Sequence, residues 1–281
     1  GAAVALVGIG QACLGLARTG AWTRAHAFVH PVTYGELMGF AALASLAWLC
    51  ARDMRAQPAA KRRAAQLALA ATLIALVLSG TRGAILGVFA GAFALSALPG
   101  RRWLALAAVP LAAASLLAAD LLPQGATRSL LLELKGRQSG QSFRLVLWTA
   151  AADMFREKPW LGTGPGAFRS QLPRYSAAGL DGERSFGTAH NLYLHHLAER
   201  GALGLASTLW LLGAMAWGAW RRARDDADAP GLWAWCAAAA FPFMNLTEVA
   251  LQTEQVWMSL FFIWFLALAR PGATGEARGG A

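Results

Sequence analysis

Long apolar blocks, separated by short polar segments, run along most of the chain. Most blocks reach about 17 residues, which is long enough for a helix to cross a bilayer, and the last is slightly shorter. The alternation of barrel strands is absent, and the Ala-, Leu- and Gly-rich blocks are longer than such strands require. We therefore predict an all-α, polytopic membrane protein with about eight transmembrane helices. The predicted spans lie near residues 1–17, 31–51, 64–80, 83–99, 103–122, 201–220, 231–247 and 255–269.

One long polar interruption, residues 123–189, divides the chain. The chain starts inside an apolar run, without Met and without the basic n-region of a signal peptide, so we expect earlier helices to precede it. The predicted organisation is five transmembrane helices in residues 1–122, a large external loop in residues 123–189 and three transmembrane helices in residues 190–281.

The external loop contains a predicted amphipathic helix. Phe143, Leu147, Ala150 and Met154 recur at helical spacing, and Pro159 limits the helix. Basic residues flank this apolar face, so we expect the helix to lie on the outer surface of the membrane. The loop holds nine Lys and Arg residues against five Asp and Glu residues, which favours an anionic ligand or headgroup surface.

The overall composition agrees with a membrane protein. Hydrophobic residues make up 57% of the chain and charged residues 14%, a balance that a soluble domain would struggle to keep from aggregating. The net charge of +10 does not indicate a nucleic-acid partner, because the basic residues lie in the connections between spans. Cys13, Cys50 and Cys236 all fall in apolar spans, where we expect buried thiols rather than disulfides or metal ligands.

The basic residues are distributed unequally between the two sides of the predicted bundle. If the connections alternate between sides, the opposite short connections carry only Arg18, Arg24 and Arg82. By the positive-inside rule the basic side is cytoplasmic, which places residues 123–189 and the connection 248–254 outside the inner membrane, with Arg82. The predicted cytoplasmic set is Arg52, Arg55, Lys61, Arg62, Arg63, Arg101, Arg102, Arg221, Arg222, Arg224, Arg270 and Arg278.

Arg82 lies within the most apolar stretch of the chain and is the first candidate functional residue. An arginine at bilayer depth costs roughly 2.5–3.5 kcal/mol on insertion scales, so it requires a partner, water or an anionic ligand. Small neighbours, Ser79-Gly80-Thr81 and Gly83, leave room for a phosphate, which the guanidinium fork suits. The alternative is a basic side chain that reaches the interface from a helix end. The sequence supports two interpretations of Arg144 equally: a residue of the same functional site, or an interfacial arginine that binds lipid headgroups.

His190 lies on the same predicted face as Arg82. An imidazole, with an unperturbed pKa near 6.5, is suited to accept a proton from a sugar hydroxyl, although a lone histidine at a helix start is usually structural. A metal site with His195 and His196 is not favoured, because their spacing from His190 is not i, i+4. His195 and Glu199, which have that spacing, indicate a structural pair.

Other polar and glycine-rich positions carry weaker signals. The Gly162-x-Gly164-x-Gly166 cluster has no strand or βαβ pattern around it, so turn chemistry is preferred over phosphate binding. Four further polar residues are candidates to line a cavity or relay protons: Glu36, Asn245, Glu248 and Glu254.

Four motifs occur in one order, namely Ser79-Gly80-Thr81-Arg82-Gly83-Ala84, Arg144 with Trp148, Pro159-Trp160-Leu161-Gly162-Thr163-Gly164 and His190-Asn191-Leu192-Tyr193-Leu194. Together, over roughly residues 64–220, they resemble the O-antigen ligase and Wzy-type O-antigen polymerase superfamily of bacterial membrane glycosyltransferases. The chain looks like the C-terminal portion of such a protein. Thr81 stands where many relatives have Ser, a change that preserves the hydroxyl.

The resemblance implies transfer of a glycan from an undecaprenyl-diphosphate carrier to a hydroxyl acceptor at the periplasmic face of the inner membrane, without a metal or another cofactor. It implies that Arg82 and Arg144 bind the carrier diphosphate and that His190 acts on the acceptor hydroxyl, so these three are the predicted catalytic residues. The expected reaction is ligation of O-antigen to lipid A-core in lipopolysaccharide biosynthesis. The expected partners are the lipid-linked donor, lipid A-core or a growing glycan, and the lipid bilayer.

Two alternatives remain open from the sequence. A Wzy-type polymerase of O-antigen or exopolysaccharide would use the same carrier and the same three residues. A transporter or flippase of lipid-linked glycans would also require interfacial arginines, but it should show paired halves related by an internal repeat, and no repeat is visible.

Overall fold

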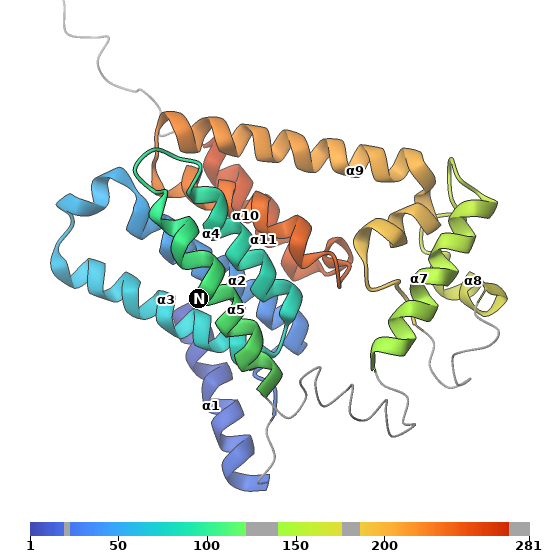
Figure 1. The fold of residues 1–281 in the computed structure, drawn as a ribbon, viewed down its shortest axis with the longest axis horizontal. Coiled ribbons are helices and arrows are strands. Elements are labelled where there is room, and N and C mark those ends of the chain that lie inside the picture. Colours follow the sequence, from blue (N-terminus) through green and yellow to red (C-terminus); the bar gives the residue numbers. More distant parts are fainter. Residues whose placement is uncertain (20–22, 122–139, 176–185, 270–281) are drawn as a thin grey trace, which may run out of the picture.

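The part of the chain that the structure describes is helical and contains no strand (Figure 1). This computed structural model describes residues 1–19, 23–121, 140–175 and 186–269. The helices are α1 (Ala2–Thr19), α2 (Pro31–Cys50), α3 (Ala59–Ser79), α4 (Arg82–Leu95), α5 (Trp103–Leu121), α7 (Gly140–Glu157), α8 (Phe168–Tyr175), α9 (Leu192–Asp225), α10 (Ala229–Met244) and α11 (Glu254–Leu268), with 3-10 turns η1 (Arg52–Ala56) and η2 (Ala250–Gln252).

The predicted all-α membrane fold is confirmed, since a helix occurs at every one of the eight predicted spans. Among the described residues, four helices, α1, α2, α3 and α9, are long and apolar enough to cross a membrane. The shorter apolar helices are α4, α10, α11 and the Trp103–Ser115 part of α5. The number of helices that cross the bilayer remains a prediction, as do the boundaries of the three predicted parts of the chain.

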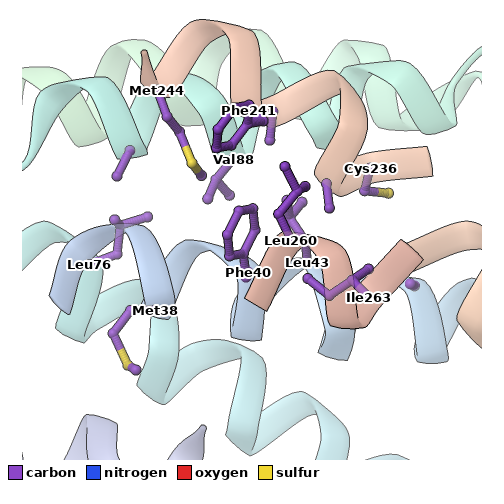
Figure 2. Packing of buried hydrophobic residues seen from close by; sticks show 14 of the residues in the cluster. Met38, Phe40, Leu43, Leu76, Val88, Cys236, Phe241, Met244, Leu260 and Ile263 are labelled. Atoms are coloured by element: carbon purple, nitrogen blue, oxygen red, sulfur yellow. The ribbon is translucent and has the colours of Figure 1, made fainter. Parts of the chain in front are cut away.

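Glycines allow the central helices α2, α4 and α10 to approach closely. A Cβ atom at Gly87 would lie 2.8 Å from the Ala240 carbonyl oxygen, and one at Gly91 would lie 2.7 Å from that of Cys236. Small residues of this kind are typical of helix interfaces in membranes, where packing rather than water exclusion drives association. Figure 2 shows the larger side chains that fill the space between the helices, among them Phe40, Leu43, Val88, Phe241 and Met244.

Large apolar side chains cover the outside of the bundle, as expected of helices that face lipid. Leu67, Leu106 and Trp210 are 71%, 82% and 75% exposed. Among the cysteines, Cys236 is buried, but Cys13 on α1 is exposed, so the expectation of three buried thiols is wrong for that residue. No other described part of the chain covers the face of α1 that carries Cys13.

The helix connections gather at two opposite ends of the bundle. At one end the Thr81 hydroxyl donates to the carbonyl of Pro31, where α2 begins. At the other end, where α2 stops, the Cys50 carbonyl accepts from Arg101 and the Ala227 carbonyl accepts from the backbone N–H of Arg52. The described connections therefore sort into the two groups that the charge distribution predicts.

A second apolar core joins α7 and α8 to the start of α9. Leu147 and Met154 of α7 pack with Phe168 of α8 and Ala198 of α9, and none of the four is exposed. The predicted amphipathic helix is present, and it ends at Glu157 before Pro159. Leu147, Ala150 and Met154, which the sequence alone assigns to the membrane surface, are instead buried against protein, whereas Leu145 is 61% exposed. The side chain of Phe143 lies outside the described residues.

A backbone break at Gly201 divides α9 and docks the glycine-rich segment that follows α7. Gly201 has φ 63° and ψ −166°, a conformation open essentially to glycine alone. A Cβ at Gly201 would lie 2.4 Å from the Trp160 carbonyl carbon, and one at Gly162 would lie 2.4 Å from that of Glu199. The Glu199 carboxylate also accepts from the backbone N–H of Phe168 at 2.9 Å. Close backbone packing thus explains Gly162, and turns with positive φ, 112° at Gly164 and 75° at Gly166, explain the other two glycines without a phosphate.

Candidate active site

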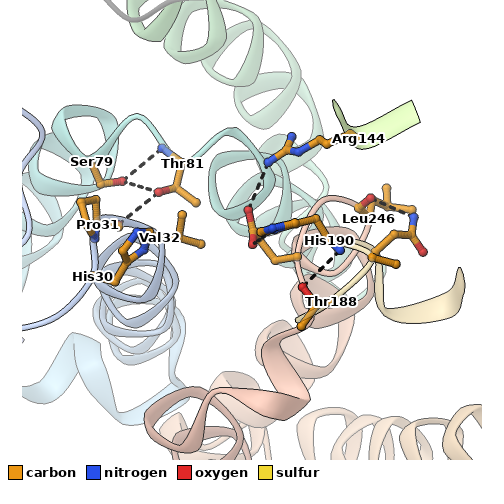
Figure 3. A network of polar contacts seen from close by, with 12 residues as sticks. His30, Pro31, Val32, Ser79, Thr81, Arg144, Thr188, His190 and Leu246 are labelled. Carbon is orange, nitrogen blue, oxygen red and sulfur yellow. Dashed lines mark hydrogen bonds and ion pairs between the residues drawn. The ribbon is translucent and has the colours of Figure 1, made fainter. Parts of the chain in front are cut away.

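The turn between α3 and α4 is held by a compact polar network (left half of Figure 3). Gly80 ends α3 in the left-handed region, with φ 64°. Ser79 Oγ lies 3.1 Å from Thr81 Oγ1, which in turn donates to the Pro31 carbonyl at 3.2 Å. Arg24 closes the network, since its Nε donates to the Ser79 carbonyl at 2.5 Å and its Nη2 to Thr81 Oγ1 at 3.2 Å.

This turn places Arg82 at the first residue of α4. The side chain is partly exposed, and it stands where the helix dipole favours anions. The next residue, Gly83, packs against the turn that follows α10, because a Cβ there would lie 2.5 Å from Thr247 Oγ1 and 3.0 Å from the Met244 carbonyl oxygen. Arg82 therefore begins its helix beside the turn that carries Glu248.

The carboxylate of Glu248 contacts both Arg144 and His190, the two side chains labelled on the right of Figure 3. Arg144 Nη2 is 3.3 Å from Glu248 Oε1, and His190 Nδ1 is 3.4 Å from Glu248 Oε2. The three side chains are 34%, 30% and 15% exposed for arginine, histidine and glutamate respectively. Two predicted site residues, 46 positions apart in the numbering, are thus joined through one acidic residue.

Two asparagines fix the Glu248 turn against the start of α9. Asn245 is fully buried, and its Oδ1 accepts from the Ala250 N–H at 2.8 Å. The Asn245 carbonyl accepts from the Leu192 N–H at 3.1 Å. Asn191, the N-cap of α9, donates from its Nδ2 to the Leu246 carbonyl at 2.9 Å. The carboxylate is therefore held on a turn with little freedom to move relative to His190.

His190 itself adopts a backbone conformation that side chains disfavour. Its φ of 48° lies in the left-handed region, where a residue other than glycine costs about 1–2 kcal/mol. Neighbouring contacts hold it there: Trp148 Nε1 donates to the carbonyl of Ala189 at 3.0 Å, and the Phe186 ring meets the imidazole edge-on with centroids 6.2 Å apart. Such strain is typical of residues whose orientation matters for function.

Arg24 adds a third cation to this end of the bundle. Burial is the main cause of a pKa below the usual value for this guanidinium, with a smaller opposing effect from the negative charge of Glu248 and a smaller lowering effect from the positive charge of Arg144. The bonds of Arg24 to Ser79 and Thr81 place it beside the start of α4, at the same end of the bundle as Arg82.

One hydrogen-bond donor near this site, Arg144 Nε, is buried and has no partner among the described residues. A buried cationic donor without a partner is costly, and an anionic ligand would satisfy it. Cations from α4, α7 and the segment before α2, together with an imidazole beside a carboxylate, form an arrangement that can bind a phosphate group and accept a proton next to it.

A family model described as O-antigen ligase (Wzy_C) matches residues 67–209, about half of the chain. The chain belongs to the O-antigen ligase family. No curated protein matches the chain. Membership in the O-antigen ligase family supports glycan transfer of the ligase or polymerase type, by a membrane enzyme that acts on lipid-linked glycans.

The O-antigen ligase match includes Arg82, Arg144 and His190 but neither Arg24 nor Glu248. The sequence motifs did not single out Arg24, and Glu248 stood only among the candidates to line a cavity or relay protons. One signal was available for Arg24, since it is one of three arginines on the arginine-poor side. His195 and Glu199, 3.5 Å apart and buried, form the predicted structural pair.

Proposed function

We propose that the protein transfers a glycan from an undecaprenyl-diphosphate carrier to a hydroxyl acceptor at the periplasmic face of the inner membrane, and that the reaction is ligation of O-antigen to lipid A-core. The observation that carries the proposal is the link from Arg144 through Glu248 to His190 in a chain of the O-antigen ligase family. It brings a cation for the leaving group next to a base for the acceptor.

The arginines act on the diphosphate. As the bond between the sugar C1 and the diphosphate oxygen breaks, negative charge grows on that oxygen. Arg82 and Arg144 would bind the diphosphate and stabilise this charge, and the N-terminus of α4 contributes in the same direction. Preorganised cations in a site of low dielectric are effective because they need no reorganisation during the reaction.

His190 acts on the acceptor. With Nδ1–H directed at Glu248, the neutral imidazole presents the Nε2 lone pair to the acceptor hydroxyl. Nε2 takes the hydroxyl proton while the oxygen attacks C1 and the diphosphate departs with the bonding electrons. Glu248 stabilises the imidazolium that forms. A single displacement inverts the anomeric centre, so linkage analysis of the product should show inversion, and retention would exclude this mechanism.

Complementation tests the proposal and separates ligase from polymerase. The gene is expressed in a ligase-null strain and in a polymerase-null strain, and lipopolysaccharide is analysed on gels. We expect long chains to become attached to lipid A-core in the first strain. A ladder that appears only in the second strain would instead assign polymerase activity. If the purified protein moved a lipid-linked glycan across a membrane but transferred no glycan to an acceptor, the protein would be a transporter.

Variants test the residues in the same ligase assay. Arg82→Ala, Arg144→Ala and His190→Ala should each lower attachment by about 100-fold or more, the range for loss of a catalytic donor or base. Arg82→Lys should recover little activity, because an ammonium lacks the bidentate fork. Arg156→Ala is the matched control, since this exposed arginine lies on α7 with Arg144 but pairs with Asp153. Intact transfer in both Arg82→Ala and His190→Ala would overturn the site assignment.

A further inference from the structure

A cavity of about 530 Å³ lies at the end of the bundle opposite the candidate active site. It is formed where α2 ends, at the turn between α4 and α5, and at the turn between α9 and α10. α2 has 20 residues, so at 1.5 Å per residue the two sites are roughly 30 Å apart. The cavity therefore takes no part in the chemistry proposed above.

Three arginines line this cavity, and among its described lining residues none is acidic. Arg101 donates to the Cys50 carbonyl at 2.7 Å, and Arg52 donates to the Asp225 carbonyl at 3.4 Å. Arg224 is partly neutralised by the Asp225 carboxylate at 3.0 Å. Arg101 is thus held at the cavity by a backbone carbonyl, and no carboxylate is among the described residues that line the cavity itself, which favours an anionic ligand.

An apolar groove of about 680 Å³ adjoins this basic cavity. Leu49, Cys50 and Trp103 line both spaces. Leu46 and Leu69 extend the groove between α2 and α3, and Arg62 and Arg63 also line it. Trp103 is 58% exposed at the start of α5, where an amphipathic ring suits the membrane interface.

We propose that the basic cavity and the apolar groove together bind an anionic glycerophospholipid, with the phosphate among Arg52, Arg101 and Arg224 and an acyl chain along the groove. We choose this ligand because basic and apolar residues line adjoining spaces. A free phosphate would occupy the cavity alone and leave the groove empty. A zwitterionic lipid would leave the arginine charge unmatched. The site also lies on the arginine-rich side of the bundle, where basic residues attract anionic headgroups. A bound lipid would contact four chain segments at this end: the end of α2, the start of α3, the turn between α4 and α5, and the turn between α9 and α10.

The test is lipid retention by the purified full chain, measured by native mass spectrometry in mixed micelles of phosphatidylglycerol and phosphatidylcholine. We expect the wild type to retain phosphatidylglycerol in preference. Replacing both exposed arginines, Arg52→Gln with Arg224→Gln, should weaken this retention by about fivefold for each charge removed. The matched control is Arg102→Gln with Arg221→Gln, which removes the same charge from exposed residues of the same end that do not line either space.

Two further experiments distinguish a phospholipid from free inorganic phosphate as the ligand. Leu69→Trp fills the groove while leaving all five arginines, and it should also reduce retention of phosphatidylglycerol. Inorganic phosphate at millimolar concentration should not displace the lipid. Equal loss in both double variants, no preference for phosphatidylglycerol, stronger retention of undecaprenyl phosphate, or displacement by inorganic phosphate would each overturn the proposal. Thermal unfolding of every variant checks that the chain is folded.

Discussion

Glu248 shows at the scale of single residues how the candidate active site depends on contacts between distant parts of the chain. Its carboxylate orients His190 through Nδ1 and holds Arg144 through Nη2. It need not touch a substrate to matter, because a partner of this kind sets the tautomer and orientation of the base and stabilises the charge that the base acquires.

Glu248→Gln should lower glycan transfer by about 10- to 100-fold, the usual range for loss of a residue that orients a catalytic group. The amide keeps the size of the side chain but cannot stabilise an imidazolium. Kinetics with lipid-linked donor should therefore show the loss in kcat more than in the KM for the donor, and Glu248→Asp should recover part of it. Glu254→Gln, an exposed change nearby at the start of α11, is the control. An equal loss in the control would show that any change near this turn disturbs the fold.

The sequence predicts only some of the residues of the site. Arg82, Arg144 and His190 lie in motifs, so their types and order point to them, although their roles stay predictions. Glu248 and Arg24 acquire their positions from tertiary contacts, across 58 residues to His190 and 57 residues to Thr81. No local pattern in one sequence marks a contact of that range.

At the scale of the elements, α9 combines two tasks that a straight helix could not perform. Its first part holds His195 and Glu199 against the segment after α7, and its second part is an apolar helix that covers the bundle. The periodic apolar pattern predicts a span near 201–220 but not the break, because glycine in a membrane helix is common and does not by itself indicate positive φ. Only the opposing backbone of Trp160 reveals why Gly201 is needed.

Gly201→Ala should destabilise the protein by about 1–3 kcal/mol, since the added Cβ meets backbone and the φ of 63° is strained for alanine. Thermal unfolding in detergent measures the effect. Gly213→Ala in the same helix is the matched control, because a Cβ added at Gly213 would have no neighbouring atom within 4 Å and the backbone there is helical. It should be neutral or stabilising by about 0.5–1 kcal/mol. Equal melting temperatures for the two variants would contradict this account of the break.

The turn between α9 and α10 should respond to pH through Asp228. Burial opposes ionisation of this carboxyl, but hydrogen bonds from Arg222 and from the Gly231 N–H outweigh it and hold the pKa of Asp228 below its usual value. Because the folded pKa is depressed, the stabilisation is present above the unfolded pKa of about 4 and disappears as the pH falls through the folded pKa.

Asp228→Asn should accordingly unfold more easily at pH 7. We expect a difference of about 1–2 kcal/mol, because Asp228 is partly exposed and solvent screens its charge, and this difference should shrink below about pH 4. Melting temperatures at pH 7 and pH 3.5 provide the measurement. Asp226→Asn, whose carboxylate is 4.0 Å from Arg222 and 44% exposed, should change little at either pH. A difference for Asp228→Asn that is unchanged at pH 3.5 would rule out the ion pair as its cause.

At the scale of the whole molecule, the bundle has two chemically different ends. One end carries Arg24, Arg82 and the Glu248 turn, and the other carries the cavity lined by Arg52 and Arg101. The apolar blocks and the charge asymmetry predict this division well, because both follow from helix length and from the sorting of connections. The packing of α7 and α8 on α9 is less predictable, since an amphipathic face gives no sign of whether it meets lipid or protein.

Cysteine labelling tests the division and the predicted orientation together. In a background with Cys13, Cys50 and Cys236 replaced by serine, single cysteines are introduced at His26 and Arg102, both exposed and at opposite ends of the bundle. In cells whose outer membrane has been made permeable, a charged maleimide cannot cross the inner membrane. It should therefore label His26→Cys at once, and Arg102→Cys only after the inner membrane is disrupted.

The two outcomes that contradict this expectation have different meanings. The reverse pattern would keep the two-ended bundle but invert it, which would place His190 on the cytoplasmic side and remove the periplasmic reaction. Labelling of both positions from outside would overturn the arrangement itself, because α2, with about 30 Å of helix, separates the Pro31 end from the Cys50 end by the thickness of a hydrocarbon core. The experiment thus bears on the fold and on the proposed function through one pair of substitutions, and complementation by each variant shows that it is folded and active.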